Sequence, residues 1–150
     1  MSWDIFRAEY KKGLDAGDDM AKLIAESYDK CIKTGMTIGA APPAPLASGN
    51  VAGLETMLKL SFSSYGVVPF PIQLDSGLKM YWLGGVTAAG ANVIVPGITA
   101  AYVPMGAANK TTEDFVEQLI RSFKVHLGQV SGLFPSAPTP LPFVGYNVPG

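Results

Sequence analysis

The sequence predicts a mainly helical α+β fold with about four helices, a Gly/Pro-rich central segment and an extended C-terminal arm. Apolar residues recur at the three- and four-residue spacing of helices in several segments. Glycine and proline interrupt the segments between them, and no charged side chain follows Lys124. The length suits one domain, so we expect a single α-rich domain over residues 1–134 and a proline-rich arm over 135–150.

Two helices are expected in the first 35 residues. Trp3, Phe6 and Tyr10 share one face of a short amphipathic helix over 3–14. Asp18 is suited to accept hydrogen bonds from the free amides of the next helix. That helix carries apolar side chains every fourth residue from Met20 to Ile32, and Gly35 ends it.

Prolines separate the second predicted helix from the third. The run 40–45 contains three prolines and is expected to be an extended linker, because proline lacks the amide donor of a helix. Asn50 opens a helix with Leu54, Met57, Leu58 and Leu60 spaced for one-sided burial. This helix should end near Tyr65 and Gly66.

The region 75–108 is ambiguous between short strands and extended arms. Its apolar runs, 78–83, 93–95 and 100–103, are separated by glycine and proline. Thr111 and Asp114 then approximate a capping box, and an apolar stripe from Phe115 to Leu127 predicts a helix that stops at Gly128. Beyond it, five prolines and the aromatic Phe143 and Tyr146 predict an arm that lies on a neighbouring subunit.

Composition points to surfaces that other proteins cover. Hydrophobic residues make up 48% of the chain and charged residues only 15%, and the net charge is -1. Such a chain has no long-range field for nucleic acid, and glycine and proline interrupt its long uncharged stretch, so we expect no membrane span. Aromatic residues are frequent in interfaces, which gives seven candidate interface residues: Trp3, Phe6, Tyr10, Tyr81, Trp82, Phe143 and Tyr146.

The sequence is poor in catalytic groups, so we expect no enzyme, no cofactor, no metal and no small-molecule substrate. Its one histidine, His126, lies in the last turn of a predicted helix, where capping or packing explains it. Cys31 is expected to be a buried small hydrophobe. Two alternatives stay open: a ligand or host-surface binding module with a platform at Tyr81 and Trp82, and a hydrolase using Glu55 and Asp75.

Several short segments stand out in order along most of the chain: 2–6, 21–29, 32–35, 49–50, 81–85, 126–127, 132–133 and 142–146. In these segments the chain resembles virion structural proteins of contractile-tailed bacteriophages that infect cyanobacteria. The chain is shorter in its middle than that family and lacks a longer proline-rich insertion.

The resemblance implies a virion component that is assembled in the host cytoplasm. Its expected partners are other copies of itself and other virion proteins, held through neutral apolar surfaces. A tail or baseplate position is favoured, with the neck or capsid as alternatives.

Overall fold

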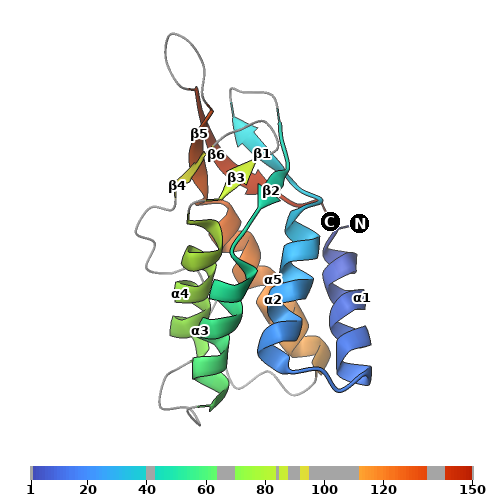
Figure 1. Cartoon of the computed structure of the whole chain (residues 1–150). Helices are drawn as coiled ribbons and strands as arrows, with labels where there is room; N and C mark the ends of the chain where they lie inside the picture. Colours follow the sequence, from blue (N-terminus) through green and yellow to red (C-terminus); the bar gives the residue numbers. More distant parts are fainter. Residues whose placement is uncertain are drawn as a thin grey trace.

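The computed structural model describes residues 2–39, 43–63, 70–83, 85–87, 92–94, 112–134 and 141–149. A group of helices stands beneath a small sheet, and the predicted mainly helical α+β fold is confirmed (Figure 1). The described helices are α1 (Ser2–Asp15), α2 (Met20–Ile32), α3 (Val51–Ser63), α4 (Phe70–Trp82) and α5 (Thr112–Leu127). The strands are β1 (Met36–Gly39), β2 (Leu46–Ser48), β3 (Val86–Thr87), β4 (Asn92–Ile94), β5 (Ser131–Phe134) and β6 (Leu141–Asn147).

Side-chain caps fix the starts of two predicted helices. Asn50 accepts a hydrogen bond from the amide of Gly53 (2.9 Å) and opens α3, as predicted. The cap of α2 is Asp19, one residue after the predicted Asp18, and it accepts from the amide of Lys22 (3.3 Å). Each cap satisfies an amide that has no partner within its helix. The predicted cap of α5 at Thr111 and the predicted end of α3 near Tyr65 lie outside the described residues.

Helix α4 corrects the expectation of strands or arms in this part of the chain. Pro71 stands in the first turn of α4, where its missing amide breaks no helical hydrogen bond. Gly77 marks a close approach of two helices, since a Cβ there would lie 2.8 Å from Leu54 Cδ1 of α3. Residues 93–94 do form a strand, β4, whereas the run 100–103 lies outside the described residues.

The six strands that the structure describes form one sheet in the order β1-β6-β5-β4-β3-β2, and all neighbours are antiparallel. Strand β6 lies between β1 and β5: Met36 pairs with Asn147, and Gly132 pairs with Phe143. The expectation that this segment is an arm on a neighbour is therefore wrong for residues 141–147, because they pair within the chain's own sheet and their aromatic side chains, Phe143 and Tyr146, are buried in its own fold. The rest of the proline-rich stretch, 135–140, lies outside the described residues.

The two ends of the strand order meet at Ala44. Thr37 of β1 donates its amide to the carbonyl of Ala44 (3.0 Å), and the amide of Ala44 donates to Thr37 Oγ1 (3.1 Å). Ala44 lies two residues before β2, which forms the opposite edge of the sheet. Residues 43–45, expected as a linker, thus connect the two edge strands.

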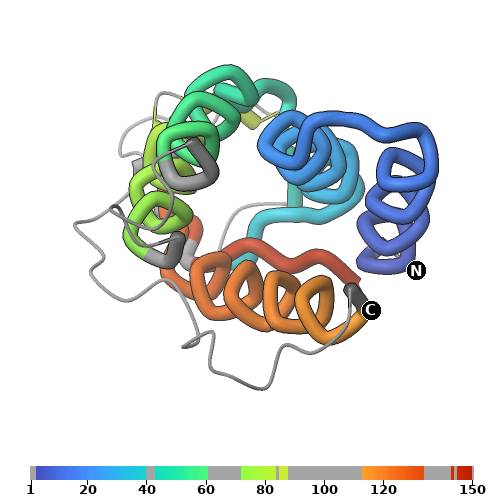
Figure 2. Tube along the Cα trace, turned by 90° about the horizontal axis from the view of Figure 1, so that it is seen from below, coloured from blue at the N-terminus to red at the C-terminus, as the bar shows by residue number. Residues whose placement is uncertain are grey.

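A chain of aromatic rings fills the centre of the helices. Phe123 of α5 packs against Trp3, Phe6 and Tyr28, with ring centroids 6.0, 5.4 and 4.7 Å apart. Seen from below, α1 and α2 lie side by side, α3 and α4 form the next pair, and α5 crosses opposite them (Figure 2). The rings therefore join α5 to both helices of the first pair.

Candidate functional site

The seven aromatic residues expected at an interface lie in the core of a single chain. None exposes more than 3% of its surface, which corrects their interpretation as contact residues. Large rings remove more apolar surface from water than other side chains, and here the chain itself provides the cover. The residues are Trp3, Phe6, Tyr10, Tyr81, Trp82, Phe143 and Tyr146.

Hydrogen bonds hold the polar atoms of three of these rings, Tyr81, Trp82 and Tyr146, inside the fold. Trp82 Nε1 donates to the hydroxyl of Tyr28 (2.8 Å), and the Tyr81 hydroxyl donates to Asp29 Oδ1 (2.7 Å). The Tyr146 hydroxyl donates to the carbonyl of Ile32 (2.6 Å) and accepts from the amide of Leu46 (2.9 Å). Burial raises the pKa of Tyr146 to about 12. The network connects helix to strand, and it leaves no aromatic platform at Tyr81 and Trp82.

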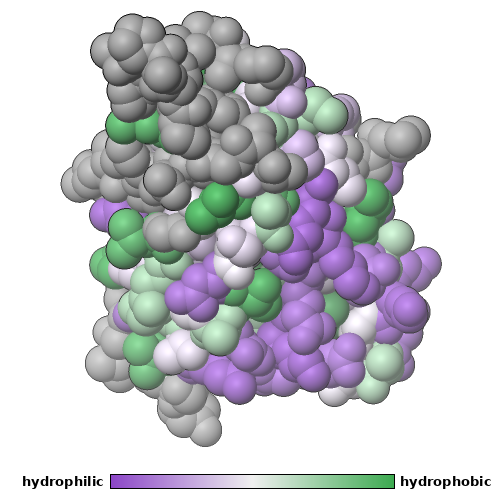
Figure 3. All heavy atoms as spheres, turned by 45° about the horizontal axis from the view of Figure 1, so that its top comes forward, coloured by the Kyte–Doolittle hydropathy of each residue, from purple (hydrophilic) through white to green (hydrophobic). Residues whose placement is uncertain are grey.

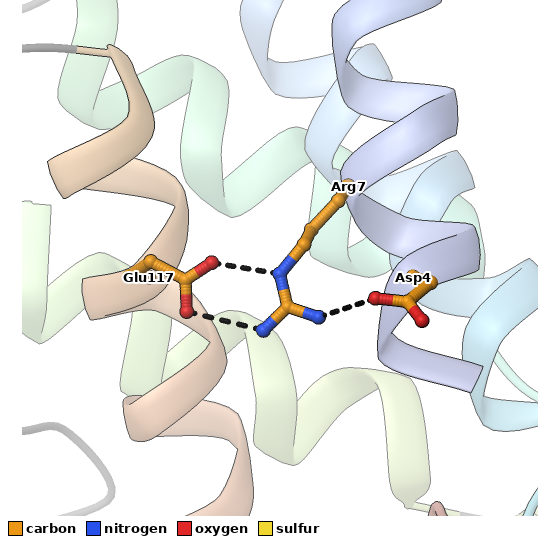
Figure 4. Close-up of polar contacts among 3 residues, drawn as sticks. All are labelled: Asp4, Arg7 and Glu117. Atoms are coloured by element: carbon orange, nitrogen blue, oxygen red, sulfur yellow. Dashed lines mark hydrogen bonds and ion pairs between the residues drawn. The ribbon is translucent and has the colours of Figure 1, made fainter. Parts of the chain in front are cut away.

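The most connected charged cluster joins α1 to α5. Arg7 donates to both carboxylate oxygens of Glu117 (2.7 and 3.1 Å) and to Asp4 Oδ1 (2.8 Å), as Figure 4 shows. The hydrogen bond from Arg7 lowers the pKa of Glu117, so this carboxylate stays ionised and is a poor base. A hollow of about 440 Å³ beside the cluster is lined by both signs of charge, including Lys11, Asp15 and Glu113. The cluster therefore links α1 to α5 through an ion pair.

His126 is buried where the sequence suggested capping or packing. Neither Nδ1 nor Nε2 has a hydrogen-bond partner, so the ring packs and does not cap α5. Burial, together with the charge of Lys79 on α4, lowers its pKa from 6.5 to about 4. The ring is neutral at pH 7. A catalytic histidine is usually oriented by a hydrogen bond to a carboxylate, and His126 has no such bond.

Cys31 is buried, as predicted, and burial raises its pKa to about 12. The thiol therefore stays protonated and unreactive at neutral pH. Among the described ranges, no three histidine, cysteine or acidic side chains come together as a metal site would need. None of the described helices has the length and hydrophobicity that crossing a bilayer requires.

Glu55 and Asp75, the acids of the hydrolase alternative, occupy equivalent places on two paired helices. Glu55 Oε1 lies 3.6 Å from Lys59 Nζ on α3, and Asp75 Oδ2 lies 3.6 Å from Lys79 Nζ on α4. Each acid thus has a lysine one turn further along its own helix. Ion pairs of this spacing are common on helix surfaces and need no catalytic explanation.

Helices α3 and α4 form an antiparallel hairpin whose outer rows, 52, 56, 60 and 72, 76, 80, hold no charged residue. Gly53 of α3 faces Met80, and Gly77 of α4 faces Met57, so one helix rises along the chain while the other falls. Four large apolar side chains on this surface are 39–68% exposed: Leu60, Ile72, Met80 and Leu83. We call this surface the hairpin face and define it by Ala52, Thr56, Leu60, Ile72, Ser76, Met80 and Leu83.

Sequence reasoning placed Leu60 in a one-sided apolar stripe and Leu83 in a strand or arm, so it missed the hairpin face. One signal was available: the rows 52, 56, 60 and 72, 76, 80 hold no charge at four-residue spacing. A surface helix normally carries mostly charged or polar residues on its outer row, whereas four of these six residues are apolar. This departure makes the hairpin face the candidate functional surface.

No protein-family model, curated protein or solved structure matches this chain.

Proposed function

We propose that this chain is a non-enzymatic structural subunit of a phage virion, placed in the tail or baseplate, with the neck or capsid as alternatives. Its partners are other copies of itself and other virion proteins. It assembles in the host cytoplasm and remains in the particle. The proposal takes its virion context from the resemblance of the ordered sequence segments, and its mode of action from the surface of the fold.

Charged and apolar residues are distributed unequally over the surface, and this observation supports the proposal. Charged residues crowd onto α1, α2 and α5, while α3 and α4 together hold four. Hydrophilic residues cover the side where α1 and α2 lie, and paler and apolar residues dominate the side of α3 and α4 (Figure 3). A soluble monomer gains nothing from concentrating exposed apolar side chains on one side, whereas a subunit buries them on assembly.

The alternative of a ligand or host-surface binding module depended on an exposed aromatic platform at Tyr81 and Trp82. Tyr81 and Trp82 are 0% exposed, and their polar atoms are bound to Asp29 and Tyr28. A stacking platform needs an exposed ring face. The described residues thus favour an assembling subunit over this module.

Fractionation of particles tests the proposed function. Particles produced from the genome that encodes the chain are purified on a density gradient, washed at high salt, and quantified by mass spectrometry. A structural subunit remains in the particle band in a fixed ratio to the other structural proteins. A chain found only in the soluble fraction of the lysate would contradict a virion role.

A further inference from the structure

The geometry of the hairpin face points to a second copy of this chain as its partner. We propose that two copies associate through a two-fold axis that lays one hairpin face on the other. The inference rests on the proposed structural function and names the contact through which it is carried out. Symmetric pairs of identical surfaces are the commonest way in which soluble chains associate.

The hairpin face has a shape that suits a second copy. Two close approaches, Gly53 to Met80 and Gly77 to Leu54, hold α3 and α4 together as one unit. The small Ala52 and Ser76 lie in the same two rows as the larger Leu60 and Ile72, so the face has both hollows and ridges. Ridges of one hairpin can therefore enter the grooves of the other, as in a four-helix bundle.

Charged residues border the hairpin face. Each helix carries one ion pair, Glu55–Lys59 on α3 and Asp75–Lys79 on α4. On α3, Met57 lies on the side of the row 52, 56, 60 that faces α4, and residues 55 and 59 lie on the other side, so the pair borders the face on the edge away from the partner helix. The contacts of Gly53 with Met80 and of Gly77 with Met57 place Glu55 level with Lys79, and Lys59 level with Asp75. The two edges therefore carry opposite charges at each height.

This order of charges makes the hairpin face complementary to itself. A two-fold axis along the helices brings Glu55 opposite Lys79 of the other copy, and Lys59 opposite Asp75. An axis across the helices brings Glu55 opposite Lys59 instead. Opposite charges meet in both cases, whereas a surface of one charge would repel its copy.

The size of the face sets the expected strength. Two helices of about 20 Å length and about 10 Å width give a footprint of roughly 400 Å² per copy. This lies below the roughly 500 Å² per partner expected of a stable specific contact and is half of the roughly 800 Å² per partner of a standard interface. We therefore expect a weak dimer, with a dissociation constant in the micromolar range or above.

Light scattering after size exclusion tests the dimer over about 10 µM to 1 mM of the purified full-length chain, the range in which a small interface forms. The wild type should pass from 15.8 kDa toward twice that mass as concentration rises. I72E/L83E introduces two acids at side chains that are 53% and 68% exposed, and it should raise the dissociation constant at least about tenfold. V125E is the matched control, since Val125 is an apolar residue of α5 with 41% exposure, and it should dimerise like the wild type.

A charge reversal adds an independent readout. E55K brings two lysines together across either two-fold axis, so it should weaken the dimer by a few-fold, less so at high salt. Circular dichroism of each variant must match the wild type, and L83E alone replaces the double variant if the latter does not fold. A dimer equally weakened by V125E and I72E/L83E, or by neither, would overturn the proposed face.

A wild type that stays monomeric throughout would overturn self-association at the hairpin face. It would leave the virion role standing, because that role is decided by the particle fractionation. If I72E/L83E then left the particle band while V125E stayed, the hairpin face would bind a different virion protein and the second copy would be the wrong occupant.

Discussion

The half of the molecule built from α1, α2 and α5 and the hairpin of α3 and α4 use different residues for the same task of packing helices. In the first half, aromatic rings around Phe123 fill the space between helices, and charged side chains cover the outside. In the hairpin, glycines let the helices approach closely, and apolar side chains remain on the outside. The first half has a surface that suits water, whereas the second has one that suits another protein.

The largest effect is expected from removing the ring that holds the first half together. Phe123→Ala leaves a cavity between α1, α2 and α5, because Phe123 is 0% exposed and contacts three other rings. We expect it to lower the free energy of unfolding by about 3–5 kcal/mol, measured by urea denaturation. Val125→Ala on the same helix is the control and should change it by less than about 0.5 kcal/mol. A loss below about 1 kcal/mol for Phe123→Ala would show that packing of the rings contributes little to the free energy of unfolding.

A smaller effect is expected from pH, at the side chain where the two halves meet. His126 of α5 has a pKa lowered to about 4 by burial and by Lys79 of α4, whereas an unfolded chain would titrate near 6.5. The unfolded state therefore binds more protons between these values, and stability falls as pH falls through this window. Between pH 7 and pH 5 the wild type should lose about 2 kcal/mol through this residue.

His126→Leu is the variant that isolates this pH effect, because it removes the titrating group and keeps an apolar side chain in its place. Its unfolding free energy should vary with pH by about 2 kcal/mol less than that of the wild type over the same range. Urea denaturation at both pH values measures the difference. Equal pH dependence in the two proteins would mean that His126 is not held in its neutral form by the fold.

The smallest effect is expected from the ion pair on the charged surface. Arg7 and Glu117 form a bidentate pair but expose 38% and 48% of their side chains, so solvent weakens their attraction. A double-mutant cycle of Arg7→Ala and Glu117→Ala should give a coupling energy of about 0.5–1 kcal/mol that shrinks in high salt. A coupling above about 2 kcal/mol would mean that charge, and not the ring cluster, fastens α1 to α5.

The sequence predicted the elements whose pattern has a local cause. Asn50 as a helix cap and the stripe from Phe115 to Leu127 each follow from groups within a few residues, and both were found. Helix α4 was missed because glycine and proline normally disfavour a helix. Here Pro71 stands in the first turn, where its missing amide breaks no hydrogen bond, and Gly77 allows close packing against Leu54. Strand β6 was wrongly expected to be an arm because the partners of Tyr146 lie at Leu46 and Ile32, far away in sequence.

The candidate site was predicted less well than the fold. Aromatic composition alone does not distinguish a core from an interface, and all seven aromatic candidates proved to be core residues. The residues of the hairpin face are ordinary leucine, isoleucine and methionine, which any buried helix would carry. Only the three-dimensional pairing of α3 with α4 showed which of them stay outside.

The position of β6 inside the sheet has a consequence for the order of events during synthesis. The ribosome completes β6 after the five other strands, yet β1 and β5 pair with it from either side. Until Asn147 reaches Met36, β1 lacks its neighbour, and contacts of such long sequence separation form slowly. Folding of the sheet is therefore delayed until β6 has been synthesised, so a nascent chain cannot present a finished sheet to an assembly before residue 147 has been made.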